Sequence, residues 1–236
     1  MRKLLIALLM APALVFAAEG ELHLDKAPDR SGNQAALQNG AKLFVNYCLN
    51  CHSASYMRYN RLKDIGLTDK QIETNLMFTA DKVGELMRVA MQRQDAKVMF
   101  GMAPPDLTLI ARARSSEAGS GADWIYTYLR GFYRDDTRPT GWNNTVFPNV
   151  GMPHVLWELQ GDQILGEEHE LKLEKPGKLS REEYDAAVAD LVGYLTYMAE
   201  PVSAYRKSLG MLVLAGLMVL FAFAYALKKE YWKDVH

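Results

Sequence analysis

The pentapeptide Cys48-Leu49-Asn50-Cys51-His52 is the most informative part of this 236-residue sequence. Two cysteines at this spacing lie on one face of a helical turn, so both sulfurs can form thioethers with the two vinyl groups of a haem. The next residue, His52, is then held beneath the iron as the proximal ligand. The motif therefore predicts one covalent haem c, attached through Cys48 and Cys51.

Other uses of a Cys-x-x-Cys pair fit this sequence less well. A thioredoxin-like redox couple needs a strand–helix–strand setting, and no such pattern surrounds residues 35–65. A zinc site needs further ligands at suitable spacing, whereas the remaining histidines are isolated. A chance occurrence is disfavoured, because these two cysteines are the only ones in the sequence.

Two amphipathic helices are expected in the globular part. The first, residues 34–47, leads into the haem motif and carries Gly40 on the same face as Phe44. The second begins with a capping box formed by Ser180 and Glu183. Their apolar stripes consist of Leu37, Ala41 and Phe44 in the first helix, and Val188, Leu191, Leu195 and Met198 in the second.

The two ends of the sequence indicate export and anchoring. A basic start, an apolar run over residues 4–16 and small residues at 17 and 18 form the pattern of a secretory signal; an uncleaved N-terminal anchor is the alternative. Residues 208–227 carry no charge, and twenty helical residues span about 30 Å, the thickness of a bilayer core. The alternative, a buried core helix, is disfavoured by the Lys-Lys-Glu-Tyr-Trp-Lys run that follows.

These signals divide the chain into three parts. Residues 1–18 are expected to be a signal peptide, 19–205 an exported haem domain, and 206–236 an anchor with a short tail. Basic residues stay on the cytoplasmic side, so the C-terminus should be cytoplasmic and the haem domain periplasmic. The formal net charge of −1 argues against a nucleic-acid partner.

A pure electron carrier needs a sixth iron ligand, and thioether sulfur would fill the site and raise the potential. Of the twelve methionines, Met152 lies on a loop rich in Pro and Gly. Met102, beside Pro104 and Pro105, is a rival, and His154 is a third candidate. The residues alone leave the choice open, with Met152 favoured slightly over Met102.

The order of these features resembles the cytochrome c1 family, the c-type haem subunits of cytochrome bc1 complexes. The resemblance covers essentially the whole mature chain. It is carried by the haem motif, by residues 102–108, 111–114, 124–129 and 144–153, and by Ala199-Glu200-Pro201 and Arg206-Lys207 before the anchor.

The resemblance implies a fold and a set of site residues. The fold would be mainly α, a class I cytochrome c-like haem domain with extended loops, followed by one transmembrane helix. Met152 would be the second axial ligand beside His52, Arg114 would contact a haem propionate, and Pro104 and Pro105 would line the haem pocket. Between residues 131 and 152 this chain is shorter than the mitochondrial members of the family. It also has His154 where the family commonly has Pro.

The resemblance also implies a function. The chain would be a respiratory electron-transport subunit of a quinol–cytochrome c oxidoreductase in a bacterial inner membrane, beside a cytochrome b. It would accept one electron from a Rieske iron–sulfur protein and pass it to a soluble or tethered cytochrome c, making no substrate bonds itself. Two alternatives are a free-standing anchored cytochrome that serves an oxidase, and a haem enzyme or sensor with an open iron.

Charge is unevenly distributed along the sequence. Residues 158–190 contain ten acidic and four basic residues, whereas the whole chain sums to −1. The ordinary interpretation is a solvated loop and helix face. The functional interpretation is that Glu167, Glu168 and Glu170 form part of a negative patch that attracts a basic cytochrome c.

Overall fold

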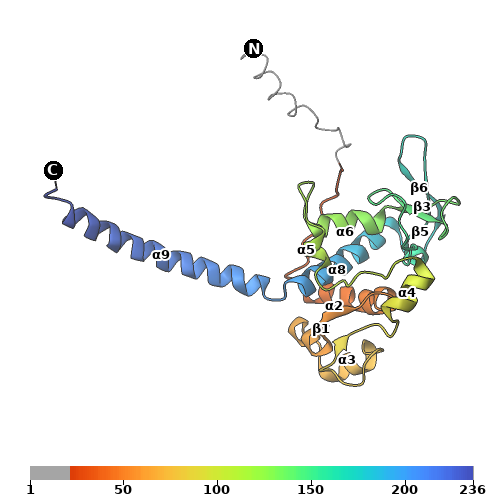
Figure 1. The fold of residues 1–236 in the computed structure, drawn as a ribbon, viewed down its shortest axis with the longest axis horizontal. Coiled ribbons are helices and arrows are strands. Elements are labelled where there is room, and N and C mark those ends of the chain that lie inside the picture. The colour runs from red at the N-terminus through yellow and green to blue at the C-terminus, as the bar shows by residue number, and fades with distance from the viewer. Residues whose placement is uncertain (1–21, 236) are drawn as a thin grey trace, which may run out of the picture.

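The computed structural model describes residues 22–235, so the predicted signal peptide over residues 1–18 lies outside the described residues. Helices form about half of the described part and are its main regular structure; this part consists of a helical body and one long helix, α9 (Ser203–Tyr231), that extends away from it (Figure 1). The prediction of a mainly α fold is therefore confirmed.

The body is built around two crossing helices, α2 (Gln34–Leu43) and α8 (Arg181–Ala199). Both begin at capped ends: the Asn33 side chain accepts from a backbone N–H of α2, and the predicted Ser180–Glu183 capping box is present on α8. A Cβ on Gly40 would lie 2.1 Å from the backbone oxygen of Asp190, so only glycine permits this approach. The sequence-based role of Gly40 is confirmed.

The first predicted helix changes its winding before the haem motif. It is α-helical to Leu43 and continues as a five-residue π-helix, η2 (Phe44–Cys48), with the Leu49 N–H donating to the Phe44 oxygen at 2.9 Å. Such π-turns are rare and frequently occur at functional sites. Phe44 packs against Tyr194 of α8, with ring centroids 5.6 Å apart.

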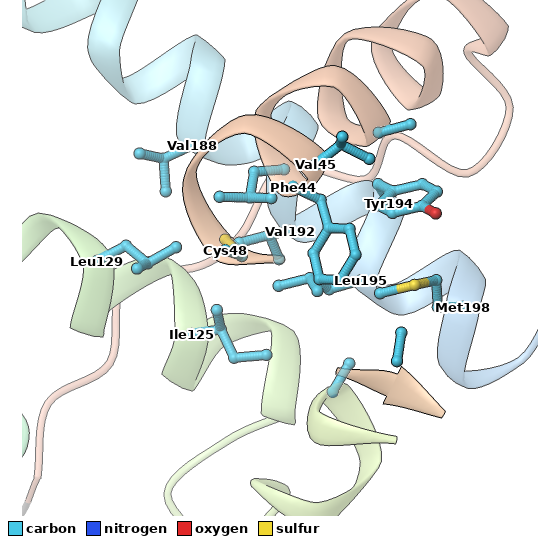
Figure 2. Close-up of a cluster of buried hydrophobic side chains, with 14 of the residues drawn as sticks. Phe44, Val45, Cys48, Ile125, Leu129, Val188, Val192, Tyr194, Leu195 and Met198 are labelled. Atoms are coloured by element: carbon cyan, nitrogen blue, oxygen red, sulfur yellow. The ribbon is translucent and has the colours of Figure 1, made fainter. Parts of the chain in front are cut away.

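A third helix, α6 (Gly121–Arg130), closes the core against α8, and a short helix, α5 (Ile110–Ala113), packs beside it. Figure 2 shows the resulting apolar cluster, with Ile125 and Leu129 of α6 facing side chains from η2 and α8. Cys48, the first residue of the haem motif, belongs to this cluster. The haem motif is thus attached directly to the core.

The remaining elements are short and lie in what the sequence suggested were extended loops. Three antiparallel two-stranded sheets join β1 (Ala54–Arg58) to β2 (Leu86–Met87), β3 (Phe132–Arg134) to β4 (Trp142–Asn144), and β5 (Gly161–Leu165) to β6 (Leu171–Pro176). The other helices are η3 (Tyr59–Ile65), α3 (Asp69–Asn75), α4 (Arg93–Phe100) and α7 (Trp157–Gln160). The strand that follows the haem motif is antiparallel to its partner, which is not the setting of a thioredoxin-like couple.

Helix α9 contains the predicted anchor. Its segment Tyr205–Tyr231 is long and apolar enough to cross a membrane, and none of it is buried inside the protein. The helix begins at Ser203, five residues before the expected start at 208. An apolar helix with no protein covering it fits a transmembrane anchor and not a core helix.

Candidate haem site

The haem motif forms one turn at the end of η2. The N–H groups of Cys51 and His52 both donate to the backbone oxygen of Cys48, at 3.1 and 2.8 Å. Burial, together with the nearby Cys51, raises the pKa of the Cys48 thiol to about 12. A site that disfavours a thiolate suits an uncharged thioether better than a metal thiolate or a reactive redox thiol.

His52 is oriented by a backbone carbonyl. Its Nδ1 lies 2.7 Å from the oxygen of Pro105, so Nδ1–H donates and Nε2 is left free to bind a metal. Burial lowers the pKa of His52, and the Pro105 hydrogen bond and the charge of Asp106 only partly oppose this. The neutral imidazole that iron requires is therefore the favoured form.

The loop that supplies this carbonyl is tied to the strand after the haem motif. The Asp106 carboxylate accepts from the N–H of Ser55 at 2.7 Å and from the Thr108 hydroxyl at 2.6 Å. The Leu107 N–H donates to the Ser53 oxygen at 2.9 Å. The residues directly after Pro105 are thus tied to the segment that follows His52.

His52 and the candidate methionines line one cleft. It encloses about 610 Å³ including its open mouth, and its wall is largely apolar. The lining residues are Tyr47, Cys51, His52, Phe100, Met102, Pro104, Pro105, Gly151, Met152, Pro153 and Val155. The structure therefore brings together Cys51, His52, both prolines and both methionines, and the free His52 nitrogen, the thioether sulfurs and the apolar wall fit a haem.

The two methionines differ in burial. Met152 is half-buried and packs against the hydrophobic core, whereas Met102 is 63% exposed. His154, the third candidate ligand, is absent from the cleft wall. Its buried ring stacks on Phe132 at 4.8 Å and meets the edge of Trp142 at 5.0 Å, and burial lowers its pKa to about 4.

Two adjacent asparagines hold the loop that carries Met152. Asn144 accepts through Oδ1 from the N–H groups of Val146 and Phe147, at 2.9 and 3.1 Å. Asn143 accepts through Oδ1 from the N–H of Asn149 at 2.8 Å. Sequence reasoning missed this role, although a turn-forming Asn pair before a Pro/Gly loop was a usable signal.

Tyr128 is a second residue that sequence reasoning missed. Its hydroxyl donates to the sulfur of Met152 at 3.4 Å, and burial raises the pKa of this hydroxyl so that it remains a donor. Residues 124–129 were noted only for their family resemblance, which does not show which way the Tyr128 side chain faces.

Arg114 is placed beside aromatic rings. Its guanidinium lies 4.4 Å from the ring centroid of Trp124 and 5.8 Å from that of Phe147. Trp124 in turn stacks on Tyr128 at 4.8 Å. Arg114 does not itself line the cleft, so its contact with a propionate stays a prediction.

The negative charge of the acidic segment, residues 158–190, is neutralised to a greater extent than the sequence suggests. Five of its ten acids form ion pairs, three of them with arginines from outside the segment; the pairs are Glu158–Lys178, Asp162–Arg134, Glu170–Lys172, Asp185–Arg130 and Asp190–Arg30. Glu167, Glu168 and Glu170 lie at the turn between β5 and β6, away from the cleft wall.

Comparison with known proteins supports the same cofactor as the geometry of the cleft. The profile of the Cytochrome C1 family matches residues 26–235. The chain belongs to the cytochrome c1 family. Its members carry one covalently bound haem c, so the cofactor predicted from the Cys48–His52 motif is confirmed. Within residues 22–235 no cluster of three or more His, Cys, Asp or Glu side chains is placed to hold a metal ion.

Several full-length relatives support this assignment. The chain is 50% identical to a cytochrome c1 of Allochromatium vinosum over all of both chains. It is 49% identical to a protein of Nitrosomonas europaea named ammonia monooxygenase gamma subunit, over 99% of this chain and 97% of that one. It is 30% identical to a cytochrome c1 of Rhodospirillum rubrum, over 86% of this chain and 83% of the relative. A haem c electron-transfer subunit is the function that these likenesses support.

Proposed function

We propose that this chain is the cytochrome c1 subunit of a quinol–cytochrome c oxidoreductase in a respiratory chain. It accepts one electron from a Rieske iron–sulfur protein and passes it to a soluble or tethered cytochrome c. The observation that carries the proposal is the cleft in which His52, fixed by a carbonyl, and Met152, on a braced loop, share one apolar wall.

Six residues at the haem site have a defined task in this proposal. Haem supplies the one-electron redox couple. Cys48 and Cys51 would anchor it, and His52 through its free Nε2 and Met152 through its thioether sulfur would hold its iron. Pro104 and Pro105 exclude water from the cleft wall, and burial with a sulfur ligand favours a high potential.

The ends of the chain support a position of this site at a membrane surface. In the proposal residues 1–18 direct export, residues 19–205 form the periplasmic domain, and residues 206–236 anchor it to the bacterial inner membrane with the C-terminus in the cytoplasm. The apolar helix α9 and the lysines that follow its uncharged part support a single-pass anchor in this orientation.

Copurification tests this proposal. The chain is solubilised from its native membrane in a mild detergent and isolated through a tag placed after the last residue. We expect a cytochrome b and a Rieske protein in stoichiometric amounts, and quinol-dependent reduction of cytochrome c by the preparation. Isolation with an oxidase, or with the subunits of a monooxygenase as the name of the Nitrosomonas relative suggests, would contradict it.

Docking of the acceptor belongs to the same proposal. Glu167, Glu168 and Glu170 lie together at the exposed β5–β6 turn, where only Glu170 has an ion-pair partner within this segment. Small redox interfaces use complementary charge mainly to raise the rate of encounter. A variant with all three residues changed to Gln should reduce a basic cytochrome c more slowly than the parent at low salt. At high salt, where the Debye length falls to a few Å, the two rates should be equal. Identical curves would remove this turn from the docking surface.

A further inference from the structure

Tyr128 touches both ends of the loop that carries the proposed sixth ligand. Its backbone oxygen accepts a hydrogen bond from Asn144 Nδ2 at 2.8 Å, where the loop begins. Its hydroxyl donates to the sulfur of Met152 at 3.4 Å, where the loop reaches the haem cleft. A length of 3.4 Å is ordinary for a hydrogen bond to a thioether sulfur, because sulfur is larger than oxygen. Such a bond is weaker than one to oxygen.

The hydroxyl is held in this position by the packing of its ring. Tyr128 is 9% exposed and lies on α6, in the hydrophobic core cluster. Trp124 stacks on one side of the ring at 4.8 Å and 14°, and Phe132 meets it edge-on at 5.1 Å and 67°. A ring packed between two aromatic neighbours cannot rotate its hydroxyl away without disturbing both.

A hydrogen bond to a metal-ligating atom changes what that atom gives the metal. Thioether sulfur has two lone pairs, so one can accept from a hydroxyl while the other faces the metal. Donation to the first lone pair withdraws electron density from the sulfur, and outer-shell hydrogen bonds of this kind orient ligands and tune redox potentials. Ferric iron depends more on electron donation than ferrous iron does, so the bond should favour the reduced state.

We propose that Tyr128 is a positioning residue for Met152: its hydroxyl fixes the orientation of the sulfur and raises the midpoint potential of the haem. The inference rests on the proposed function, in which Met152 is an axial ligand. It adds to that function a named residue of this chain that sets the strength of the ligand.

The test is a potentiometric titration of the haem-loaded full chain in detergent, with Tyr128→Phe compared to the parent. The substitution keeps the stacked ring and removes only the hydroxyl. We expect the ratio of oxidised to reduced protein at a fixed ambient potential to rise several-fold, where a tenfold rise equals about 59 mV for one electron. We also expect a shifted sulfur-to-iron charge-transfer band in the oxidised protein.

The chain offers a matched control. The buried Tyr194 also donates its hydroxyl to a methionine sulfur, that of Met87 at 3.6 Å, but neither residue lines the cleft. Tyr194→Phe should therefore leave both the potential and the charge-transfer band unchanged. An equal shift in the two variants would overturn the proposal, because it would show a general effect of losing a buried hydroxyl.

Failure of the inference can be told from failure of the ligand assignment. Met152→Leu should abolish the charge-transfer band if Met152 is the ligand, whatever Tyr128 does. An unshifted potential in Tyr128→Phe, with the band lost in Met152→Leu, would overturn the role of Tyr128 alone. If Tyr128→Phe does not fold, proton NMR of the reduced parent decides: a slowly exchanging phenol proton close to the Met152 methyl group supports the bond, and its absence refutes it.

Discussion

The crossing of α2 and α8 can be tested by adding a single methyl group at Gly40. A Cβ there would lie 2.1 Å from the Asp190 oxygen and 2.7 Å from Tyr194 Cβ, whereas ordinary contacts begin near 3.4 Å. The helices would have to separate by about 1.3 Å. Overpacking of this kind costs about 1–3 kcal/mol, and the closest atom is backbone, which cannot rotate away. The gain in helix propensity from Gly to Ala, up to about 1 kcal/mol, offsets only part of this cost.

Because the nearest atom is backbone, the cost should lie in the upper part of this range, and after the propensity gain we expect Gly40→Ala to lower the free energy of unfolding by about 1–2 kcal/mol, or about 2–8 °C in Tm for a domain of this size. The assay is thermal unfolding in one detergent, followed by circular dichroism and haem absorbance. Gly32→Ala is the matched control, because a Cβ there meets nothing within 4 Å. Equal melting temperatures for Gly40→Ala and the parent would refute the close approach of the two helices.

Three further predictions concern the anchor, Arg114 and acid stability. A chain that stops after Arg206 should remain soluble in the periplasm with its haem and spectrum intact, since the apolar part of α9 is not buried in the body; loss of haem would contradict this. Arg114→Gln should lower the free energy of unfolding by about 0.5–1 kcal/mol through loss of the Trp124 contact. It should shift the midpoint potential only if Arg114 also binds a propionate, and a potentiometric titration of Arg114→Gln beside Arg114→Lys would show this. Burial raises the pKa of Asp123, but hydrogen bonds from backbone N–H groups, a serine and a lysine outweigh burial and lower the pKa to about 2. About 2 kcal/mol of stability should therefore be lost as the pH falls from about 4 to 2. Asp123→Asn should flatten that part of the curve of unfolding free energy against pH.

The elements that sequence predicted best are those with local, periodic signals. The capping box at Ser180 marks the start of α8, and the Gly40 face marks its crossing with α2, because both depend on residues three or four positions apart. The π-turn before Cys48 was not foreseen, since one extra residue in a turn leaves the apolar pattern almost unchanged. The short strands β1 to β6 were missed for the same reason, because two to six residues are too few to establish a period.

The candidate site was predictable as a set of residues but not as a geometry. The spacing of Cys48, Cys51 and His52 is enough to specify a haem, because the chemistry is confined to five consecutive positions. The hydrogen bond from Tyr128 to Met152 joins residues 24 positions apart, and no pattern within either segment reveals it.

The central claim is that the site is closed by the sulfur of Met152, which makes the chain an electron carrier and not an open haem enzyme. Carbon monoxide binding to the reduced protein tests it most directly, with the parent, Met152→Leu and Met102→Leu measured side by side. We predict that the parent and Met102→Leu do not bind carbon monoxide, whereas Met152→Leu binds it and has a lower midpoint potential. Binding by the parent, or by Met102→Leu in place of Met152→Leu, would contradict the claim.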